Sequence, residues 1–395
     1  MTKVSQQSRD VPPVAEPPWL RPRALYVHIP FCAHKCGYCD FASIAGADDL
    51  ADRYLDALDR EMRRALKGDR PQVDTIFLGG GTPTRLDARQ LDRLLARLRE
   101  LVDLTPEGEW TVEANPGTLD EEKVRVLAAG GVNRVSLGAQ SFQPSALKAL
   151  ERNHDPDDVP RAVDLIRRRF DRWSLDLIFG APGTTLGQWS ADLDRAIGLE
   201  PSHLSCYGLV YEKGTSLWKQ WNAGAVQAVD EEVEHDMYAL TIDRLVDAGL
   251  RHYEISNFAR PGHESRHNLV YWANDAYYGF GLGATRYVDG VRASNTRDLL
   301  AYLRRIERGE EATGPTERLE PEERGRETAV LMLRRLELGI DREDFRRRCG
   351  LDLDDLCGES LARSVARGWL IDDGRRLKLS RSGLFLADTV MSDLL

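Results

Sequence analysis

The strongest constraint on how this chain folds is a regular alternation of short apolar runs with amphipathic segments. The amphipathic segments include 49–68, 88–102 and 188–199. Their apolar residues recur every three or four positions, a spacing typical of helices that pack on one face. Because parallel strands need helical crossovers, six strand–helix units predict an α/β fold with a parallel sheet closed or nearly closed into a barrel. A doubly wound open sheet is the alternative. The six predicted strands are residues 24–31, 74–80, 109–115, 134–140, 173–180 and 203–210.

The alternation occupies residues 23–225, and different patterns flank it. Residues 1–22 are rich in Pro, Gln and Ser and are expected to form a disordered arm. Residues 226–310 are expected to be a connecting segment, with an acidic helix followed by a stretch rich in Gly and Tyr. The last part, 311–395, predicts a winged-helix-like α+β domain. Its expected elements are helices over 323–336 and 341–349, a hairpin over 368–383 and a closing helix over 383–395.

Length and charge exclude some classes of function. The 395 residues include 30% charged side chains and carry a formal net charge of −10, which gives no general attraction for nucleic acid. Residues 1–23 lack the apolar core of a secretory signal, and no apolar run approaches the roughly 18 residues of a membrane-spanning helix. We therefore expect a cytoplasmic protein that does not bind nucleic acid. In that reducing compartment the six cysteines predict no disulfide framework.

Three of the six cysteines stand close together, directly after the first predicted strand. Cys32, Cys36 and Cys39 have the spacing CxxxCxxC, whereas the other three are scattered. A structural zinc site needs four ligands, so His28, His34 or a distant residue would have to complete it. Alternatively, three thiolates hold a [4Fe–4S] cluster and leave one iron without a protein ligand. Three buried cysteines without a metal are the remaining interpretation.

Other unusual residues follow the remaining predicted strands. In a barrel of parallel strands, chemistry gathers at the carboxyl ends of the strands. Glycines let a backbone approach a ligand closely, a carboxylate pairs with an ammonium group, and an arginine fork pairs with a carboxylate. A tight turn, surface charges or an internal polar network would also explain such residues. They are Gly79–Pro83 after the second strand, Glu113 and Asn115 at the third, Gln140 and Ser141 at the fourth, Arg152 beyond it and Asp176 in the fifth.

The cysteine spacing, together with YVHIPFC, LGGGTPT, EANPG, RVSLGAQSF and DLIFGAPG, resembles the radical S-adenosylmethionine (SAM) superfamily. In that family the cosubstrate chelates the open iron, and an electron from the cluster splits its sulfonium bond to give a 5′-deoxyadenosyl radical. The resemblance implies that Cys32, Cys36 and Cys39 bind a [4Fe–4S] cluster. It also implies contacts to SAM from Tyr26, Tyr38 (through its main chain), Gly80, Gly81, Thr82, Glu113, Gln140, Arg152 and Asp176.

Within this superfamily, nearly all of the chain after residue 22 resembles the branch of oxygen-independent coproporphyrinogen III oxidase. That resemblance implies a partial (β/α)6 TIM-like barrel followed by a C-terminal domain. Two departures argue against the oxidase itself. Its signature continues to a fourth cysteine, CxxxCxxCxC, where this chain has Phe41. The oxidase also has a long ordered segment before its cysteines, and here only 31 residues precede them, many of them in a proline-rich stretch.

A second motif resembles a sister group of the oxidase, the HemW haem chaperones. Residues His267-Asn268-Leu269-Val270-Tyr271-Trp272 match the HNxxYW motif that is associated with haem there. An imidazole can ligate haem iron, and Tyr and Trp side chains can pack on a porphyrin or bind its propionates. The resemblance implies haem-binding roles for His267, Asn268, Tyr271 and Trp272. A histidine beside aromatic residues is, however, often a hydrogen-bonded core residue.

The function expected from these features is that of a haem carrier. By the resemblance, such a protein binds haem and transfers it to an acceptor, for example of the respiratory chain, while the cluster and SAM control conformation, assembly or transfer. It needs an electron donor, and the resemblance allows a cluster-dependent homodimer. The alternative is a radical SAM enzyme that decarboxylates a tetrapyrrole such as coproporphyrinogen III. A third interpretation is radical chemistry on an unrelated substrate.

Overall fold

The computed structural model describes residues 20–395, so the arm predicted over residues 1–22 lies almost entirely outside the described part of the chain. The largest element is a twelve-stranded mixed sheet with the order β14-β13-β12-β11-β1-β4-β5-β6-β7-β8-β10-β9. Its six middle strands, from β1 to β8 in that order, are the predicted ones, and they run parallel to one another. The α/β fold with a partial (β/α)6 barrel is therefore confirmed.

The bounds of the elements are as follows. The large sheet contains β1 (Ala24–Ile29), β4 (Gln72–Gly80), β5 (Asp103–Ala114), β6 (Arg134–Gln140), β7 (Trp173–Phe179), β8 (His203–Gly208), β9 (Arg251–Glu254), β10 (Asn257–Ala259), β11 (Tyr277–Phe280), β12 (Thr285–Val288), β13 (Val291–Asn295) and β14 (Thr313–Glu317). The small strands are β2 (Phe31–Cys32), β3 (Ile44–Ala45), β15 (Ile340–Asp341), β16 (Leu370–Asp372) and β17 (Arg376–Leu379). The α-helices are α1 (Ala51–Leu66), α2 (Ala88–Leu101), α3 (Glu121–Ala129), α4 (Pro144–Ala149), α5 (Asp158–Arg167), α6 (Leu186–Gly198), α7 (Ser216–Asn222), α8 (Glu231–Asp247), α9 (Arg266–Trp272), α10 (Leu299–Glu307), α11 (Pro321–Leu333), α12 (Arg342–Cys349), α13 (Leu353–Ala366), α14 (Arg381–Leu384) and α15 (Ala387–Ser392).

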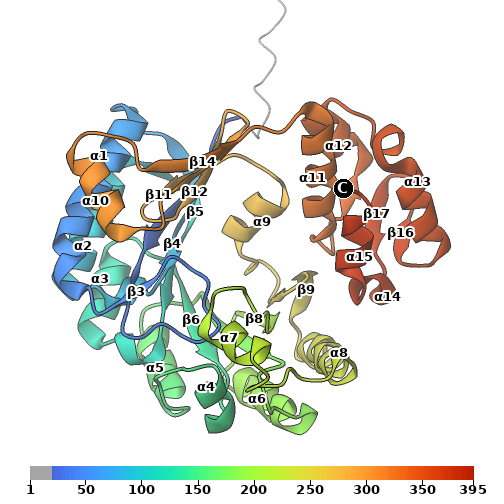
Figure 1. Ribbon diagram of the computed structural model, residues 1–395, viewed down its shortest axis with the longest axis horizontal. Coiled ribbons are helices and arrows are strands. Elements are labelled where there is room, and N and C mark those ends of the chain that lie inside the picture. The colour runs from blue at the N-terminus through green and yellow to red at the C-terminus, as the bar shows by residue number, and fades with distance from the viewer. Residues whose placement is uncertain (1–19) are drawn as a thin grey trace, which may run out of the picture.

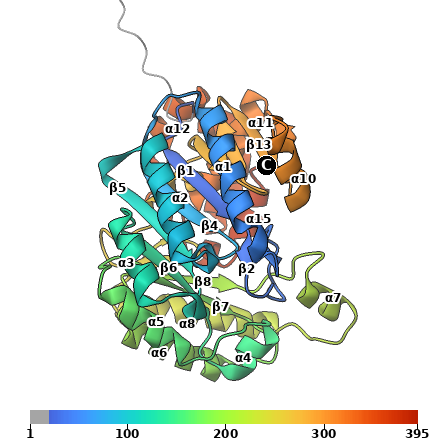
Figure 2. The same cartoon turned by 90° about the vertical axis from the view of Figure 1, so that its left-hand side faces the viewer.

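The helices that connect the parallel strands cover the outer face of the sheet. Figure 1 shows α1, α2 and α3 on one side of the strands, and Figure 2, which looks at that side, shows α1 and α2 in front of β1 and β4. Helix α1 buries Leu55, Leu58 and Met62, a helical spacing of three and four residues. Helix α2 begins at a capping box, in which the side chains of Asp87 and Gln90 each accept the other's backbone N–H. The inner face of the barrel is thus left for other contacts.

The segment predicted as a connection over 226–310 contributes strands to the sheet. β11 pairs in parallel with β1, from Ala24 beside Tyr277 to Val27 beside Phe280. β12, β13 and β14 continue this edge in antiparallel order, and β10 and β9 extend the opposite edge beyond β8. β14 lies within the range predicted for the C-terminal domain, but it pairs with β13 in the large sheet. Local periodicity does not indicate these pairings because their partners lie far apart in the sequence.

The C-terminal unit has the element order of a winged helix: α11, β15, α12, α13, β16 and β17. The three short strands form an antiparallel sheet, in which β16 and β17 are the predicted hairpin. Two details differ from the sequence prediction. Helix α13 was not predicted, and its buried face includes Cys357 and Ser364 as well as leucines. The predicted closing helix is divided into α14 and α15 at Leu386, whose φ of −118° and ψ of 22° are not helical.

Helix α9, which carries the HNLVYW sequence, lies between the sheet and the C-terminal unit (Figure 1). It contacts β4 on one side and α11 on the other. The C-terminal unit also contacts β9 through backbone hydrogen bonds. The backbone N–H of Leu336 donates to Tyr253 O at 3.0 Å, and the backbones of Arg335 and Glu254 form an isolated antiparallel β-bridge. Within residues 20–395, none of the helices combines the length and the apolar composition needed to cross a bilayer.

Candidate functional site

A cavity of about 640 Å³ lies at the carboxyl ends of the parallel strands. Its wall comes from the loop after β1 and from the ends of β4 to β8. Most residues predicted to hold the cluster and SAM line this one cavity. They are Cys32, Cys36, Cys39, Tyr38, Gly80, Gly81, Thr82, Glu113, Gln140, Arg152 and Asp176. The structure therefore brings together residues that are spread over 145 positions of sequence, from position 32 to position 176.

Tyr26 is the one predicted SAM contact that does not line the cavity. Its ring stacks on Phe77 of β4, with 6.2 Å between ring centroids. Its hydroxyl lies 3.0 Å from Nδ1 of His28. Burial and the charge of Glu113 raise the pKa of Tyr26 well above its ordinary value, so this residue stays a neutral phenol beneath the cavity wall.

Cys32 is the last residue of β2, and Cys36 and Cys39 lie in the loop between β2 and β3, which pair in parallel and close it. Cys32 Sγ lies 3.7 Å from Thr82 Oγ1, and Cys36 Sγ accepts a hydrogen bond from Arg152 Nη1 at 3.4 Å. Burial raises the pKa of the Cys32 and Cys39 thiols. All three thiols are free of disulfides. All three line one cavity. Arg152 and Thr82 lie beside two of them, and such hydrogen-bonding neighbours orient thiolate ligands.

The GGGTP sequence packs so closely against β1 that its centre accepts only glycine. Gly80 has a φ of +108°, and a Cβ there would lie 2.3 Å from the ring of His28. The Gly80 N–H donates to Glu113 Oε2 at 3.1 Å. Two residues later, Thr82 Oγ1 accepts a hydrogen bond from Asn115 Nδ2 at 2.7 Å. This loop therefore presents backbone groups and a hydroxyl along the cavity wall between β1 and β5.

Two acidic side chains lie at the inner end of the cavity wall, Glu113 on β5 and Asp176 on β7. Burial and the charge of Asp176 raise the pKa of Glu113 to about 8, although the Gly80 N–H opposes this shift. Burial also raises the pKa of Asp176, against hydrogen bonds from Ser205 at 2.7 Å and Ser136 at 2.9 Å. A cationic partner such as the ammonium group of an amino acid would stabilise the ionised form of Glu113.

Arg152 and Gln140 line the side of the cavity after β6. Arg152 Nη2 donates to Asn115 Oδ1 at 2.7 Å and to Gly138 O at 2.6 Å, while its Nε has no hydrogen-bond partner among the described residues. Gln140 has a φ of +64°, at the point where the pairing of β6 with β7 shifts register. A residue other than glycine in this region costs on the order of 1–3 kcal/mol, and such strain gathers at ligand sites.

Two residues of the cavity wall were not predicted from the sequence. Ser136 on β6 and Tyr207 on β8 line it, and Tyr207 is 41% exposed. The available signal was the period of two along β8, in which Ser205 and Tyr207 are polar residues on one face. At the mouth, Phe41 and Val210 are 61% and 62% exposed and form an apolar rim.

The cavity residues fit a cofactor with thiolate-bound metal and an amino-acid group. The wall offers three free thiols, a carboxyl group at Glu113 with a raised pKa and an unused N–H at Arg152. Among residues 20–395, no three His, Cys, Asp or Glu side chains converge as the ligands of a single metal ion do. In a [4Fe–4S] cube each thiolate binds a different iron atom.

The predicted haem-binding residues lie on α9, away from the cavity wall. His267 is only 1% exposed. Its Nδ1 lies 2.8 Å from Thr75 Oγ1, and its Nε2 lies 2.8 Å from Tyr271 Oη. Burial lowers the pKa of His267 to about 3, so its ring is neutral at pH 7. Because both ring nitrogens have partners, His267 as placed here has no free lone pair for haem iron.

Asn268 and Trp272 are less enclosed than His267. Both are half-buried, and the backbone N–H of Asn268 donates to the helix-capping hydroxyl of Ser265 at 3.4 Å. Trp272 Nε1 has no hydrogen-bond partner among the described residues. The guanidinium of Arg334, from the C-terminal unit, lies 4.3 Å from the centroid of the Trp272 ring. This end of α9 therefore combines an aromatic face, a free N–H and a cation.

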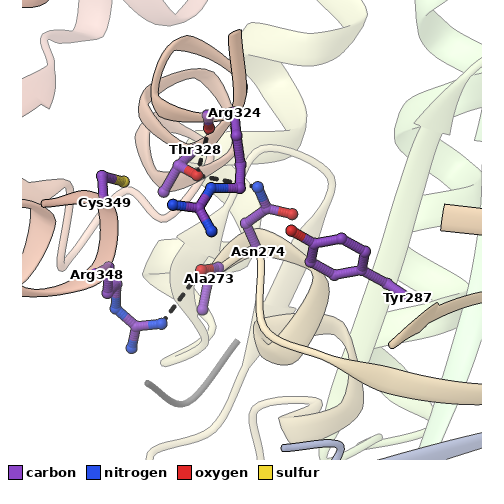
Figure 3. Close-up of a pocket in the computed structure, with 7 residues that line it drawn as sticks. All are labelled: Ala273, Asn274, Tyr287, Arg324, Thr328, Arg348 and Cys349. Carbon is purple, nitrogen blue, oxygen red and sulfur yellow. Dashed lines mark hydrogen bonds between the residues drawn. The ribbon is translucent and has the colours of Figure 1, made fainter. Parts of the chain in front are cut away.

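A much smaller pocket lies just beyond the end of α9, where the chain meets the C-terminal unit (Figure 3). Its volume of about 10 Å³ is that of one water molecule. Arg348 Nη1 donates to Ala273 O at 3.3 Å, and Asn274 Nδ2 donates to Thr328 Oγ1 at 2.9 Å. These bonds join the end of α9 to α11 and α12. The pocket is too small for a porphyrin and serves as a junction.

Several known proteins are similar to this chain in sequence. Residues 26–196 match the radical SAM superfamily, and residues 319–386 match the HemN C-terminal domain. The heme chaperone HemW of Lactococcus lactis is 35% identical over 382 residues, which cover 95% of this chain and 98% of that protein. The chain belongs to the HemW family. HemW of Bacillus subtilis is 35% identical over 371 residues, covering 93% and 98%, and HemW of Escherichia coli is 37% identical over 295 residues, covering 72% and 76%.

A solved structure has the same fold as this HemW-family chain. Coproporphyrinogen III oxidase (HemN) from Escherichia coli, a radical SAM enzyme, superposes with a TM-score of 0.84 at 24% identity. The match covers 96% of this chain and 91% of the oxidase. The matches to the radical SAM superfamily, to the HemN C-terminal domain and to HemW proteins confirm the resemblance to this branch of the superfamily. Membership of the superfamily implies a [4Fe–4S] cluster and SAM.

Proposed function

We propose that this protein is a haem chaperone, which binds haem and transfers it to an acceptor protein. The observation that carries the proposal is the 35% identity to a protein named heme chaperone HemW, over 95% of this chain and 98% of that protein. The HNLVYW sequence of α9 supports it. We expect the acceptor to be a protein of the respiratory chain, and we expect an electron donor, a cytoplasmic location and a cluster-dependent homodimer.

In this proposal the large cavity holds a [4Fe–4S] cluster and SAM. Cys32, Cys36 and Cys39 bind three irons, and the cosubstrate takes the fourth. When bound, the cluster supplies the electron that cleaves SAM reductively. Glu113 pairs with the ammonium group of SAM, and Arg152 pairs with its carboxylate. The remaining contacts come from Tyr38, Gly80, Gly81, Thr82, Gln140 and Asp176, while Tyr26 supports this wall from beneath.

Haem is proposed to bind at α9, with His267 as the iron ligand. Asn268, Tyr271 and Trp272 complete the motif, and the ring of Trp272 packs on the porphyrin. Arg334 lies 4.3 Å from that ring, where a guanidinium suits a propionate. Because both nitrogens of His267 are hydrogen-bonded in this structure, haem binding requires a local rearrangement of α9.

The test is a comparison of haem binding with catalysis by anaerobically reconstituted protein. Titration with haem is expected to give a saturable Soret band, and mixing with a haem-free acceptor protein is expected to move that band to the acceptor. His267→Ala is expected to weaken the band. A protein that gives no saturable Soret band at equimolar haem is not a haem chaperone.

The second candidate is an enzyme of the oxidase type. It is favoured by the complete set of cavity residues and by the fold shared with coproporphyrinogen III oxidase. Phe41, in place of the fourth cysteine of the oxidase signature, disfavours it. Incubation with coproporphyrinogen III, SAM and a reductant separates the two, because only the enzyme releases carbon dioxide and protoporphyrinogen.

A further inference from the structure

A row of hydrogen bonds crosses the cavity wall and joins two of the three cysteines. Arg152 Nη1 donates to Cys36 Sγ at 3.4 Å, and Arg152 Nη2 donates to Asn115 Oδ1 at 2.7 Å. Asn115 Nδ2 donates to Thr82 Oγ1 at 2.7 Å, and Thr82 Oγ1 lies 3.7 Å from Cys32 Sγ. We call Arg152, Asn115 and Thr82 the relay. Its members follow three different strands, β6, β5 and β4, so local sequence does not connect them.

The direction of every bond in the relay follows from the chemistry of its groups. A guanidinium has donors only, so the Asn115 amide turns its oxygen to Arg152 and its NH2 group to Thr82. The hydroxyl of Thr82 therefore accepts from Asn115, and its single proton is left for the sulfur of Cys32. A metal-bound thiolate has no proton to give, so Cys32 is the acceptor. Both ends of the relay thus present a donor to a cysteine sulfur.

Asn115, in the middle of the relay, is held through both its backbone and its side chain. Its carbonyl oxygen accepts from the N–H and the hydroxyl of Thr118, at 3.0 Å and 2.8 Å. Gly138 lies against the bond to Arg152, and a Cβ at that position would lie 3.1 Å from Asn115 Oδ1. Thr82 is 2% exposed, so little water competes for its hydroxyl. The geometry of the relay is therefore fixed by the protein itself.

We propose that Asn115 is a positioning residue that sets the reduction potential of the cluster through the relay. It makes Thr82 a donor to Cys32, and it holds the guanidinium of Arg152 beside Cys36. A hydrogen bond to a ligating sulfur offsets part of the negative charge of that sulfur, favours the reduced cluster and so raises the reduction potential. This inference rests on the proposed function of the three cysteines as ligands of a [4Fe–4S] cluster.

The donor to Cys32 is tested with Thr82→Val, which keeps the shape of threonine without the hydroxyl, and with Thr82→Ser, which restores the hydroxyl. A redox titration of anaerobically reconstituted protein without SAM, followed by EPR, measures the potential. Thr82→Val is expected to shift the equilibrium about tenfold toward the oxidised cluster, a fall of about 59 mV for one electron. Thr82→Ser is expected to recover the wild-type potential. An unchanged potential in Thr82→Val with a full content of iron and sulfide overturns the relay.

The role of Asn115 is tested with Asn115→Asp. A carboxylate only accepts, so the Thr82 hydroxyl turns to it and leaves Cys32 without a donor, while the bond from Arg152 is kept. The potential is expected to fall at least as far as in Thr82→Val, and an unchanged potential overturns the relay even if Thr82→Val assembles no cluster. The fall is expected to be smaller in the Thr82→Val background, where only the added charge acts. Equal shifts in the two backgrounds also overturn the relay.

The matched control is Ser43→Ala. Ser43 Oγ also lies 3.7 Å from a cysteine sulfur, that of Cys39, but it is no member of the relay. The shift in potential caused by Ser43→Ala is therefore expected to be the same with Asn115 and with Asn115→Asp. A shift that depends on residue 115 would trace the coupling to the charge of the cluster as a whole and would overturn the relay.

The same samples separate failure of this inference from failure of the proposed function. Wild-type protein that assembles no cluster, by iron and sulfide analysis and by EPR, overturns both. Wild-type protein with a complete cluster, whose potential neither the Thr82 nor the Asn115 variants change, leaves the proposed function intact and removes the relay alone.

Discussion

The cavity of the barrel and the helix α9 both carry residues that the sequence marks as ligands, but they differ in how these residues are bonded. At the cavity the thiols are free, Arg152 has an N–H without a partner among the described residues, and Glu113 has a pKa of about 8. At α9 both nitrogens of His267 have hydrogen-bond partners inside the core.

This difference separates a site that is formed before its ligand arrives from one that must be opened. Buried polar groups without hydrogen-bond partners are stabilised when a complementary ligand binds, because they are already desolvated in the ligand-free protein. A histidine whose ring nitrogens are both hydrogen-bonded must lose one of these bonds before it can bind haem iron. The affinity for haem is lowered by the free energy of that exchange. The comparison predicts tight and fast binding of SAM at the cavity and slower loading of haem at α9.

The largest expected effect breaks the cavity while leaving α9 intact. Replacing Cys32, Cys36 and Cys39 together by Ser is expected to abolish the bound iron and sulfide and the absorbance of the cluster, because all three protein ligands are lost. Haem binding is expected to persist, since α9 does not line the cavity. Iron and sulfide analysis and a haem titration check both expectations. Loss of haem binding in folded protein would mean that the two sites are not independent.

The next effect concerns the cost of a buried carboxylate. The pKa of Glu113 is raised from 4.5 to about 8, so this group favours the folded state in its protonated form, and its stabilisation is lost as the pH rises from 4.5 to 8. Above that range Glu113→Gln is expected to raise the free energy of unfolding of the cofactor-free protein by about 2 kcal/mol, less than the full shift because the cavity admits water.

The same variant is expected to bind SAM at least about tenfold more weakly, because the amide cannot pair with the ammonium group. Chemical denaturation near pH 9 and equilibrium dialysis with SAM give the two quantities. The conservative variant Glu113→Asp is the control, since it keeps a charge. A variant that is less stable at high pH, or that binds SAM normally, contradicts this role.

A third effect sharpens the comparison from the side of α9. Burial lowers the pKa of His267 from 6.5 to about 3. The folded state therefore favours the neutral ring, and the corresponding stability is present above pH 6.5 and is lost as the pH falls from 6.5 towards 3. At pH 5 this single histidine is expected to cost about 2 kcal/mol of unfolding free energy. His267→Gln is expected to remove that part of the pH dependence.

The smallest effect is expected at the cavity mouth. Phe41 is 61% exposed, so Phe41→Cys is expected to change the free energy of unfolding by less than about 0.5 kcal/mol. If the protein is a carrier rather than an enzyme, restoring the fourth cysteine of the oxidase signature is not expected to create decarboxylase activity. Product analysis after incubation with coproporphyrinogen III decides. Turnover by this variant would place the functional difference between the two groups at this residue.

The sequence predicted the barrel and the residues of the cavity well because both follow from local patterns. Each of the six strands is a short apolar run, and the residues at its carboxyl end must meet the neighbouring ends. It did not predict the partners of His267. Thr75 lies 192 positions away, and no local pattern indicates that α9 docks on the first half of β4. For the same reason it missed the pairing of β11 with β1 and took residues 226–310 for a connection.

That pairing of β11 with β1 has a consequence for how the molecule can be divided. A fragment that ends at residue 225 would expose the backbone N–H and C=O groups along one whole side of β1, a long apolar edge that invites aggregation. The radical SAM half is therefore no detachable module. Strand β1 leads into the cysteine loop, and its pairing partner β11 follows the HNLVYW sequence in the chain. An excised barrel would therefore need β11 supplied in trans to stay soluble.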